Sequence, residues 1–261
     1  MSRFPVLMYH RIRSQRLPVA DPAERPWAVS AEAFEWQLDR LASLGKTGVT
    51  MAQAHDALLS GSGVPREWVV LTFDDGNESD HVHALPLLSA RGFRATFFVC
   101  GRRVGESGGL EREMIREMHA AGMHVGSHAM THRFLTTLSA RDEEDEVARS
   151  KELLEAVVDK PVDHFAPPGG RWSKRTADTL RRLQYRAVST SSFGYNDART
   201  VKFAYRRIPI VEATTRARFD SIVAGERWKL AAGYVRAGSL GLARRAMGEA
   251  TYARVRGYRD R

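Results

Sequence analysis

The chain contains very little cysteine and no long hydrophobic run. Cys100 is the one cysteine among its 261 residues, which excludes an intrachain disulfide. It follows the apolar segment 95–99, so we expect it to be buried as a small hydrophobic residue. No segment reaches the roughly 18 apolar residues of a membrane-spanning helix. The first residues also lack the apolar core of a secretory signal, and we therefore expect a cytoplasmic protein.

The sequence also lacks the patterns of a nucleic-acid-binding protein, although it is strongly basic. Its formal net charge is +9 and its sequence pI is about 10.0. Such a surface suits nucleic acid, an anionic membrane or a phosphorylated ligand. We find no nucleic-acid-binding module and no interleaving of aromatic with basic residues. We therefore expect a solvated basic surface and no nucleic-acid partner.

Apolar runs alternate with helix-like patterns, which predicts a parallel sheet wrapped by helices. The predicted strands are 4–9, 68–73, 94–99, 123–125, 164–166, 185–189 and 206–211. The predicted helices are 30–44, 80–90, 110–121, 139–158 and 173–183. This order predicts an α/β fold, a distorted (β/α) barrel of about seven strands that spans residues 1–225.

A basic helical extension is predicted for the last residues, 226–261. Apolar residues alternate there with many arginines, which indicates two basic amphipathic helices. Two interpretations remain open. The helices pack on the barrel, or they contact a partner or an anionic membrane. The membrane interpretation would place the protein at the inner face of the membrane.

Two short motifs supply the side chains that metal-assisted hydrolysis requires. Asp74 and Asp75 follow a predicted buried strand, and Gly76 after them permits a turn. His128 and His132 follow another strand, and on a helical turn their spacing puts both imidazoles on one face. The C-terminal ends of barrel strands carry the active site, so these groups are expected to meet. An Asp-His-His set leaves a coordination position for water, with a second carboxylate beside it.

Three motifs together resemble a known family. They are Thr72-Phe73-Asp74-Asp75-Gly76, then Ser127 followed by His128-Ala129-Met130-Thr131-His132, and finally Ala166-Pro167-Pro168-Gly169-Gly170. The first two resemble the first two motifs of the polysaccharide deacetylases of NodB homology, carbohydrate esterase family 4. The third is similar to that family's Arg-Pro-Pro-Tyr-Gly-like turn. The resemblance spans about residues 4–215 and leaves out the basic extension.

The resemblance implies a role for each motif residue. Asp75, His128 and His132 would bind a divalent metal, usually zinc in this family and in some members cobalt or nickel. Asp74 would be the general base. The backbone N–H of Gly169 would stabilise the oxyanion that forms when water attacks the acetamide carbonyl.

The chain departs from the family pattern in its third and last motifs. Ala166 stands where the family has the arginine that orients the base, and Arg171 is the predicted stand-in. No histidine follows His164, so the C-terminal acid of the family is missing. Segment 5–10 resembles the N-terminal Tyr-His strand of circularly rearranged members, which implies that His10 is the acid. A histidine that only caps the strand is the alternative.

The fourth motif is also altered. Residues 189–194 lie where the family has an Asp-Trp pair that walls the acetyl pocket. Trp172 or Phe193 is the predicted replacement, with Arg171 beside them in substrate binding.

The resemblance implies metal-dependent removal of an N-acetyl group from an amino sugar. The expected substrate is an N-acetylated polysaccharide or its lipid- or nucleotide-linked precursor. Two alternatives stay open: a non-catalytic sugar-binding protein with this fold, and a hydrolase of non-sugar amides. The missing arginine and the altered fourth motif favour the sugar-binding alternative, whereas the intact Asp74, Asp75, His128 and His132 favour the enzyme.

Overall fold

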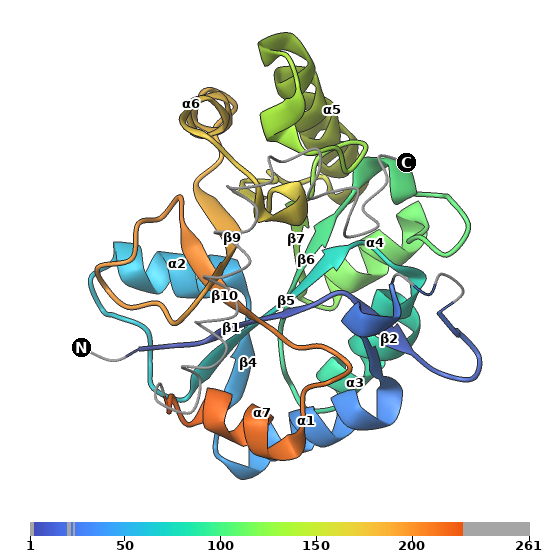
Figure 1. The fold of residues 1–261 in the computed structure, drawn as a ribbon, viewed down its shortest axis with the longest axis vertical. Helices are drawn as coiled ribbons and strands as arrows, with labels where there is room; N and C mark the ends of the chain where they lie inside the picture. Colours follow the sequence, from blue (N-terminus) through green and yellow to red (C-terminus); the bar gives the residue numbers. More distant parts are fainter. Residues whose placement is uncertain (1–2, 20–21, 23, 227–261) are drawn as a thin grey trace.

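A closed parallel barrel forms the centre of the computed structural model, which describes residues 3–19, 22 and 24–226 (Figure 1). Its sheet has the strand order β1-β10-β9-β8-β7-β6-β5-β4, and a further pairing of β1 with β5 closes seven strands into a ring. The strands are β1 (Val6–Tyr9), β4 (Thr47–Val49), β5 (Trp68–Asp75), β6 (Thr96–Val99), β7 (His124–Ser127), β8 (His164–Phe165), β9 (Ala187–Phe193) and β10 (Tyr205–Pro209). The predicted barrel is confirmed.

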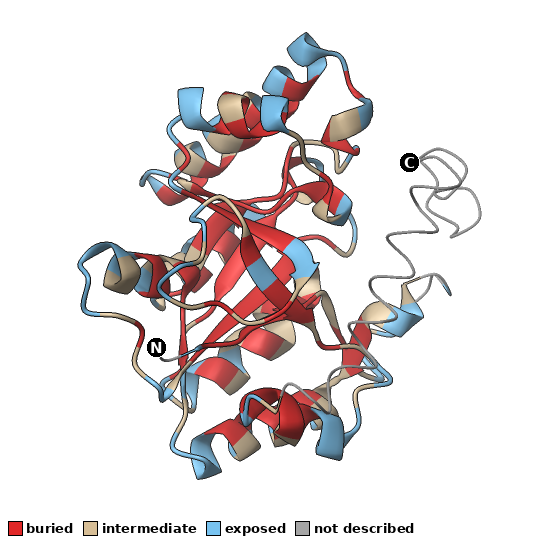
Figure 2. Cartoon of the chain, turned by 60° about the vertical axis from the view of Figure 1, so that its left-hand side comes forward, coloured by how far each residue is buried: buried red, intermediate tan, exposed pale blue. Residues whose placement is uncertain are grey.

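Helices cover the outside of the barrel (Figures 1 and 2). They are α1 (Ala31–Ser43), α2 (Met51–Leu59), α3 (Leu85–Ser89), α4 (Arg112–Ala120), α5 (Ala140–Val158), α6 (Lys174–Arg182) and α7 (Arg216–Val223). Ser30 caps α1, because its side chain accepts a hydrogen bond from the Ala33 N–H. Within the described residues, no helix has both the length and the apolar character needed to cross a membrane.

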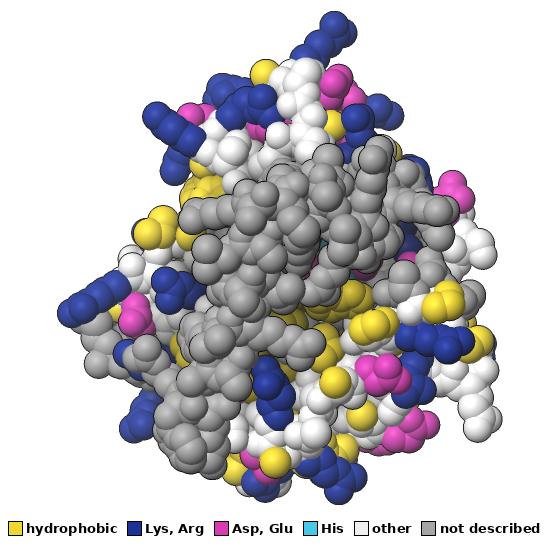
Figure 3. Space-filling view, in the orientation of Figure 1, with side chains coloured by type: hydrophobic (Ala, Val, Ile, Leu, Met, Phe, Trp, Pro, Cys, Tyr) yellow, Lys and Arg dark blue, Asp and Glu magenta, His cyan; other side chains and the backbone are white. Residues whose placement is uncertain are grey.

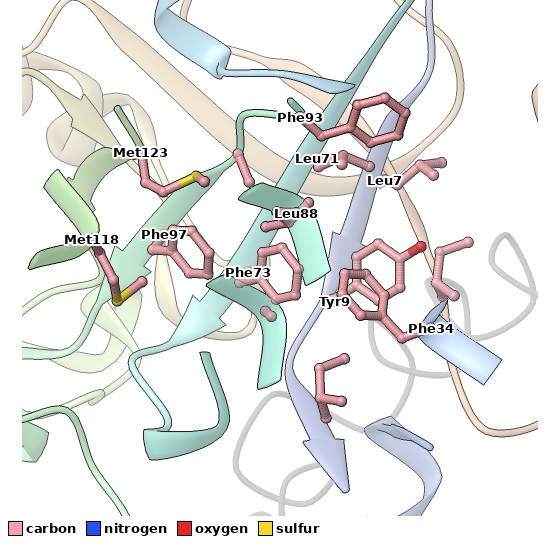
Figure 4. Close-up of a cluster of buried hydrophobic side chains, with 14 of the residues drawn as sticks. Leu7, Tyr9, Phe34, Leu71, Phe73, Leu88, Phe93, Phe97, Met118 and Met123 are labelled. Carbon is pink, nitrogen blue, oxygen red and sulfur yellow. The ribbon is translucent and has the colours of Figure 1, made fainter. Parts of the chain in front are cut away.

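Every second strand residue points outward and packs under the helices (Figure 4). Tyr9 of β1 stacks on Phe73 of β5 with ring centroids 5.1 Å apart, and Phe73 stacks on Phe97 of β6 at 4.7 Å. Phe34 of α1 meets both Tyr9 and Phe73 edge to face. This aromatic row joins three neighbouring strands to the helix layer and fixes which side chains point into the barrel.

The alternate positions point into the barrel, and several of them are polar. Along β7 these positions are His124, Gly126 and His128, the last lying one residue beyond the strand. His124 is at the N-terminal end of the barrel and His128 at the C-terminal end. Gly126 lies between them, where an added Cβ would come within 2.6 Å of the Phe98 ring. The barrel interior therefore has two polar layers separated by an aromatic ring.

Some elements differ from the prediction for local reasons. The predicted helix 80–90 is divided into a π-helical turn, Asp80–Ala84, and α3. Strand β4, helices α2 and α7, and the small sheet of β2 (Arg11–Arg13) and β3 (Ala28–Ser30) were not predicted. The three strands among them have three residues each, too few to show a period. Cys100 is buried as predicted. The predicted extension, apart from its first residue, lies outside the described residues.

Candidate active site

The two neighbouring carboxylates at the end of β5 have different partners because the backbone turns between them. Asp75 has φ +83° and Gly76 has φ +73°. A non-glycine residue at positive φ is unusual and is typical of functional sites. At Gly76 an added Cβ would also lie 2.8 Å from Cγ1 of Val99. The predicted turn is confirmed, and Asp75 takes part in it.

Asp75 meets both histidines of the second motif. Its Oδ1 lies 3.4 Å from Nε2 of His128 and 3.4 Å from Nε2 of His132. The predicted helical turn is wrong, because residues 128–132 form a loop in which Ala129 and His132 both have φ +62°. These two left-handed residues reverse the chain, so the imidazoles converge without helical spacing.

Hydrogen bonds hold this loop and the first histidine in place. Nδ1 of His128 lies 2.7 Å from the carbonyl oxygen of Ala166, which directs Nε2 toward Asp75. The Thr131 N–H donates to Oε2 of Glu146 at 2.7 Å, and the Thr131 hydroxyl donates to Oε1 of the same carboxylate. Glu146 belongs to α5 and was not singled out from the sequence.

Asp75, His128 and His132 fit a divalent cation. Ligand bonds of about 2.1 Å at tetrahedral angles separate the ligand atoms by about 3.4 Å, which agrees with the spacing here. Burial alone would raise the pKa of Asp75, but hydrogen bonds from His128 and His132 outweigh it and hold that pKa well below its usual value. An ionised carboxylate and two imidazoles are a typical zinc donor set.

The second carboxylate, Asp74, is held by Arg207 inside the barrel. Nη1 of Arg207 donates to Oδ1 at 2.6 Å and Nη2 donates to Oδ2 at 2.8 Å. Nε of Arg207 donates to the carbonyl oxygen of Thr190 at 2.9 Å, which fixes the guanidinium. Burial raises the pKa of Asp74, but the charge of Arg207 outweighs it and lowers that pKa. Asp74 is thus an oriented, ionised carboxylate.

The sequence prediction that Arg171 orients the base is wrong. Arg171 is buried against Phe134, with its guanidinium carbon 3.9 Å from the ring centroid. Arg207 holds the Asp74 carboxylate instead. It is distant in sequence, but β10 and β5 both pair with β1 in the closed barrel, so the two side chains meet. The missed signal was an arginine within an apolar strand, since a fully buried arginine requires an acidic partner.

His10 reaches the same end of the barrel. It directly follows β1, and the Asn77 side-chain amide donates to its carbonyl oxygen at 3.0 Å. Its ring lies against Trp27, with centroids 5.1 Å apart. Burial lowers the pKa of His10, whereas the nearby charges of Asp75 and Asp74 act to raise it. Nδ1 of His10 is buried and has no hydrogen-bond partner among the described residues.

The remaining predicted residues lie on loops and strand ends at this edge. Gly169 is in a 3₁₀ turn after β8 with φ +61°, and an added Cβ would lie 2.6 Å from the Phe134 ring. Trp172 follows this turn and is half-buried. Phe193 is the last residue of β9 and packs partly against the main hydrophobic cluster. Substrate contact by Trp172, Arg171 and Phe193 stays a prediction.

The chain matches one family model and several characterised proteins. The polysaccharide deacetylase family model matches residues 61–188. The peptidoglycan-N-acetylmuramic acid deacetylase PdaA of Bacillus subtilis is 27% identical over 198 residues, which cover 72% of this chain and 73% of PdaA.

Two solved structures share the fold over their whole length. The Streptococcus pyogenes deacetylase PplD in complex with acetate has a TM-score of 0.77 at 25% identity, covering 85% of this chain and 98% of PplD. IcaB from Ammonifex degensii has a TM-score of 0.73 at 27% identity, covering 86% of this chain and 97% of IcaB. Together with the family model and the site geometry, these matches show that the chain contains a polysaccharide deacetylase domain of NodB homology.

Proposed function

We propose that this protein is a metal-dependent N-deacetylase that acts on an amino sugar in a polysaccharide or its lipid- or nucleotide-linked precursor. The proposal rests mainly on one observation: a possible metal-binding set and a fixed carboxylate lie side by side at the same end of the barrel. Asp75, His128 and His132 form a cation-binding set, and Asp74 is held beside it by Arg207. The family supports sugar deacetylation in general, since PdaA and PplD are both named deacetylases.

Zinc is the metal we propose, with cobalt and nickel as alternatives. A divalent cation at this site lowers the pKa of water and polarises the acetamide carbonyl. The protein itself holds the metal-binding side chains in fixed orientations. Asp75 is oriented by the strained turn at the end of β5, and His128 by its bond to Ala166.

Asp74 acts in this proposal as the general base. It accepts a proton from the attacking water, while Arg207 keeps its carboxylate ionised and oriented. The backbone N–H of Gly169 donates a hydrogen bond to the carbonyl oxygen as negative charge develops there. The tight approach of Gly169 to Phe134 supports a fixed position for this N–H.

His10 acts in this proposal as the general acid that protonates the leaving amine nitrogen. Support comes from its place directly after β1, at the same end of the barrel as Asp74 and Asp75. The free Nδ1 in the buried interior and the packing against Trp27 also support a ring held for proton transfer. The carbon-nitrogen bond breaks, the amine takes the proton, and acetate leaves.

The sugar-binding alternative loses one of its two grounds. It rested on the missing arginine of the third motif and on the altered fourth motif, and Arg207 supplies the missing guanidinium to Asp74 from another strand. A protein without turnover would gain nothing from a buried, ionised base next to a metal-binding set.

We also propose that the enzyme is cytoplasmic and works at the inner membrane face. The net charge of +9 supports attraction to an anionic surface. On the face shown in Figure 3, the visible Lys and Arg side chains are scattered and form no single patch. Membrane contact would then depend on residues 226–261, nearly all of which lie outside the described residues.

Acetate release from N-acetylglucosamine oligomers tests the proposed reaction. The zinc-loaded protein should release acetate, and the Asp74→Asn variant should be slower by about 100- to 10,000-fold, the usual contribution of a general base. The variant should still bind zinc, because Asp74 is not a ligand. Acetate release at an equal rate by Asp74→Asn would refute the assignment of the base.

A further inference from the structure

One buried side chain, that of Asn77, connects the end of β1 with the turn that carries Asp74 and Asp75. Asn77 directly follows this turn and is 2% exposed. Its Nδ2 donates to the carbonyl oxygen of His10 at 3.0 Å and to that of Asp74 at 3.4 Å. The first bond has an ordinary length and the second is long. The same amide thus contacts both strand ends that supply the proposed acid and base.

This contact lies where the pairing of β1 with its neighbours ends. The paired residues of β1 end at Tyr9, which lies opposite Phe73 of β5, and the pairing with β10 ends one residue earlier. Strand β5 extends two residues beyond Phe73 and pairs there with β6. His10 therefore lies one residue beyond the last paired residue of β1. The bond from Asn77 holds the chain at the point where the paired strands no longer do so.

Two arginines fix which way the Asn77 amide faces. Nη2 of Arg11 donates to Oδ1 of Asn77 at 2.9 Å, and Nη2 of Arg103 donates to the same oxygen at 3.0 Å. A guanidinium has donors only, so both contacts require the amide oxygen, and the amide nitrogen faces the two carbonyls. Arg103 is itself held, because its Nη2 also donates to the Gly108 carbonyl oxygen at 3.2 Å. The amide is therefore bonded at both of its ends.

The backbone around Asn77 is fixed as well. The Asn77 N–H donates to Oδ2 of Asp80 at 3.1 Å, and Asp80 is fully buried in the π-helical turn. Asn77 also pairs with Gly109 in an antiparallel bridge, and the carbonyl oxygen of Gly76 accepts from the Leu110 N–H at 3.1 Å. A side chain whose own backbone is held in this way can fix the position of another segment.

We infer that Asn77 is a positioning residue, which holds His10 in place relative to Asp74 through the bond to the His10 carbonyl oxygen. The inference rests on the proposed function, in which His10 protonates the leaving amine. Proton transfer requires donor and acceptor within hydrogen-bond reach, and a displacement of about 1 Å can cost about 100-fold in rate. Asn77 itself binds no metal and transfers no proton.

Asn77→Asp tests the inference in the full-length, zinc-loaded protein. The aspartate keeps an oxygen for both arginines, which hold it ionised, but it has no N–H for the two carbonyls. Its kcat for acetate release from N-acetylglucosamine oligomers should fall by about 10- to 100-fold, with KM and zinc content unchanged. Asn77→Ala removes the same donor without adding charge, and its kcat should fall as well.

Ser79→Ala is the matched control. Oγ of Ser79 accepts from the Ile12 N–H at 3.1 Å, so it joins the same two segments but does not contact His10. Ser79 is also buried, and its loss should lower stability while kcat remains that of the wild type. An equal loss of kcat in Ser79→Ala and Asn77→Asp would show a general effect of joining the segments and would overturn the inference.

Coupling to His10 separates positioning from a general loss of structure. If Asn77 acts through His10, Asn77→Asp should change kcat by less than about twofold in a His10→Gln background, because residues that act through one another have non-additive effects. The inference is overturned by the full loss of kcat in that background as well. A wild-type kcat in Asn77→Asp, or loss of its bound zinc, would also overturn it.

A readout without turnover distinguishes failure of this inference from failure of the proposed function. The His10 ring lies 5.1 Å from the Trp27 ring, so its NMR resonances depend on its place beside the indole. These resonances are identified by their absence in His10→Gln. They should shift in Asn77→Ala and stay in place in Ser79→Ala. Unshifted resonances in Asn77→Ala would overturn the inference, whereas a wild type that releases no acetate would refute the proposed function.

Discussion

The two ends of strand β7 carry the same kinds of residue in different settings. At the C-terminal end, His128 and His132 meet Asp75 on a strained loop, and the His132 side chain is 37% exposed. At the N-terminal end, His124 and His164 meet Asp163 on regular strands, and His164 is 1% exposed. In both groups an aspartate and two histidines place their ligand atoms within 4.8 Å of one another.

The difference teaches that ligand identity alone does not define a catalytic metal site. Beside the C-terminal group lie a buried carboxylate, Asp74, fixed by Arg207, and a histidine, His10, on a neighbouring strand end. In the N-terminal group, His124 bonds Thr96 and His164 bonds Asp163 instead. A fixed carboxylate beside the three possible ligands favours chemistry at the C-terminal end.

The largest effect on the rate of acetate release should come from replacing an aspartate. Asp75 at the C-terminal end of the barrel and Asp163 at the N-terminal end are compared. Asp75→Ala should lower the rate of acetate release by about 1,000-fold or more, because it removes a metal ligand worth several kcal/mol in the transition state. Asp163→Asn should keep the rate within about twofold and lower the melting temperature. Steady-state assays at saturating zinc make the comparison. Equal losses of rate in the two variants would mean that both ends serve catalysis.

The second largest effect should come from replacing His10, the proposed general acid at the C-terminal end of the barrel. His10→Gln should reduce kcat by about 100- to 10,000-fold, because the leaving amine then lacks its proton donor. Its zinc content should remain that of the wild type. His55→Gln is the matched change at the N-terminal end of the barrel and should leave kcat unchanged. Full activity in His10→Gln would contradict the role of His10 as general acid and would mean that it only caps β1.

Two arginines that pair with aspartates, Arg207 and Arg186, give a comparison of the free energy of unfolding. Arg207→Met leaves Asp74 buried without a partner, so the free energy of unfolding should fall by about 3–5 kcal/mol. Arg186→Met breaks half-exposed pairs with Asp56 and Asp163 and should cost about 1 kcal/mol or less. Urea unfolding of both variants, made without zinc, measures the difference. Similar losses would contradict the buried position of the Arg207 pair.

The smallest effect should come from the carboxylates of α5. Glu146→Gln removes one acceptor from Thr131, so the loop with His132 loosens and zinc affinity at the active site should fall by about tenfold. Glu155→Gln is the control, since Glu155 lies on the same helix and bonds the Val162 N–H. Acetate release at limiting zinc reports the change. An equal response of the two variants would show that the loop does not depend on Glu146.

Short sequence motifs predicted many of the side chains at the C-terminal end of the barrel, because these side chains directly follow strands. Asp74, Asp75, His128 and His132 follow strand ends in the sequence, and parallel strands bring such ends together. The helical turn expected for His128 and His132 was wrong, since positive φ at Ala129 is not visible in residue types. Short strands such as β4 were missed for lack of a period.

Contacts across the barrel could not be predicted in the same way. Arg207 and Asp74 are 133 residues apart in sequence, and only closure of the ring brings them together. The sequence also left His124 and His164 without a role. Their proximity follows from the pairing of β7 with β8 and from inward alternation, which residue types alone do not show.

Recovery of activity by zinc tests the central claim most directly. Metal-free protein is titrated with zinc, and acetate release from N-acetylglucosamine oligomers is followed for the wild type and for Asp75→Ala. We predict that activity is absent without zinc, returns as zinc occupies the wild-type active site, and does not return in Asp75→Ala. Acetate release that persists in the chelator-treated wild type would contradict a metal-dependent deacetylase.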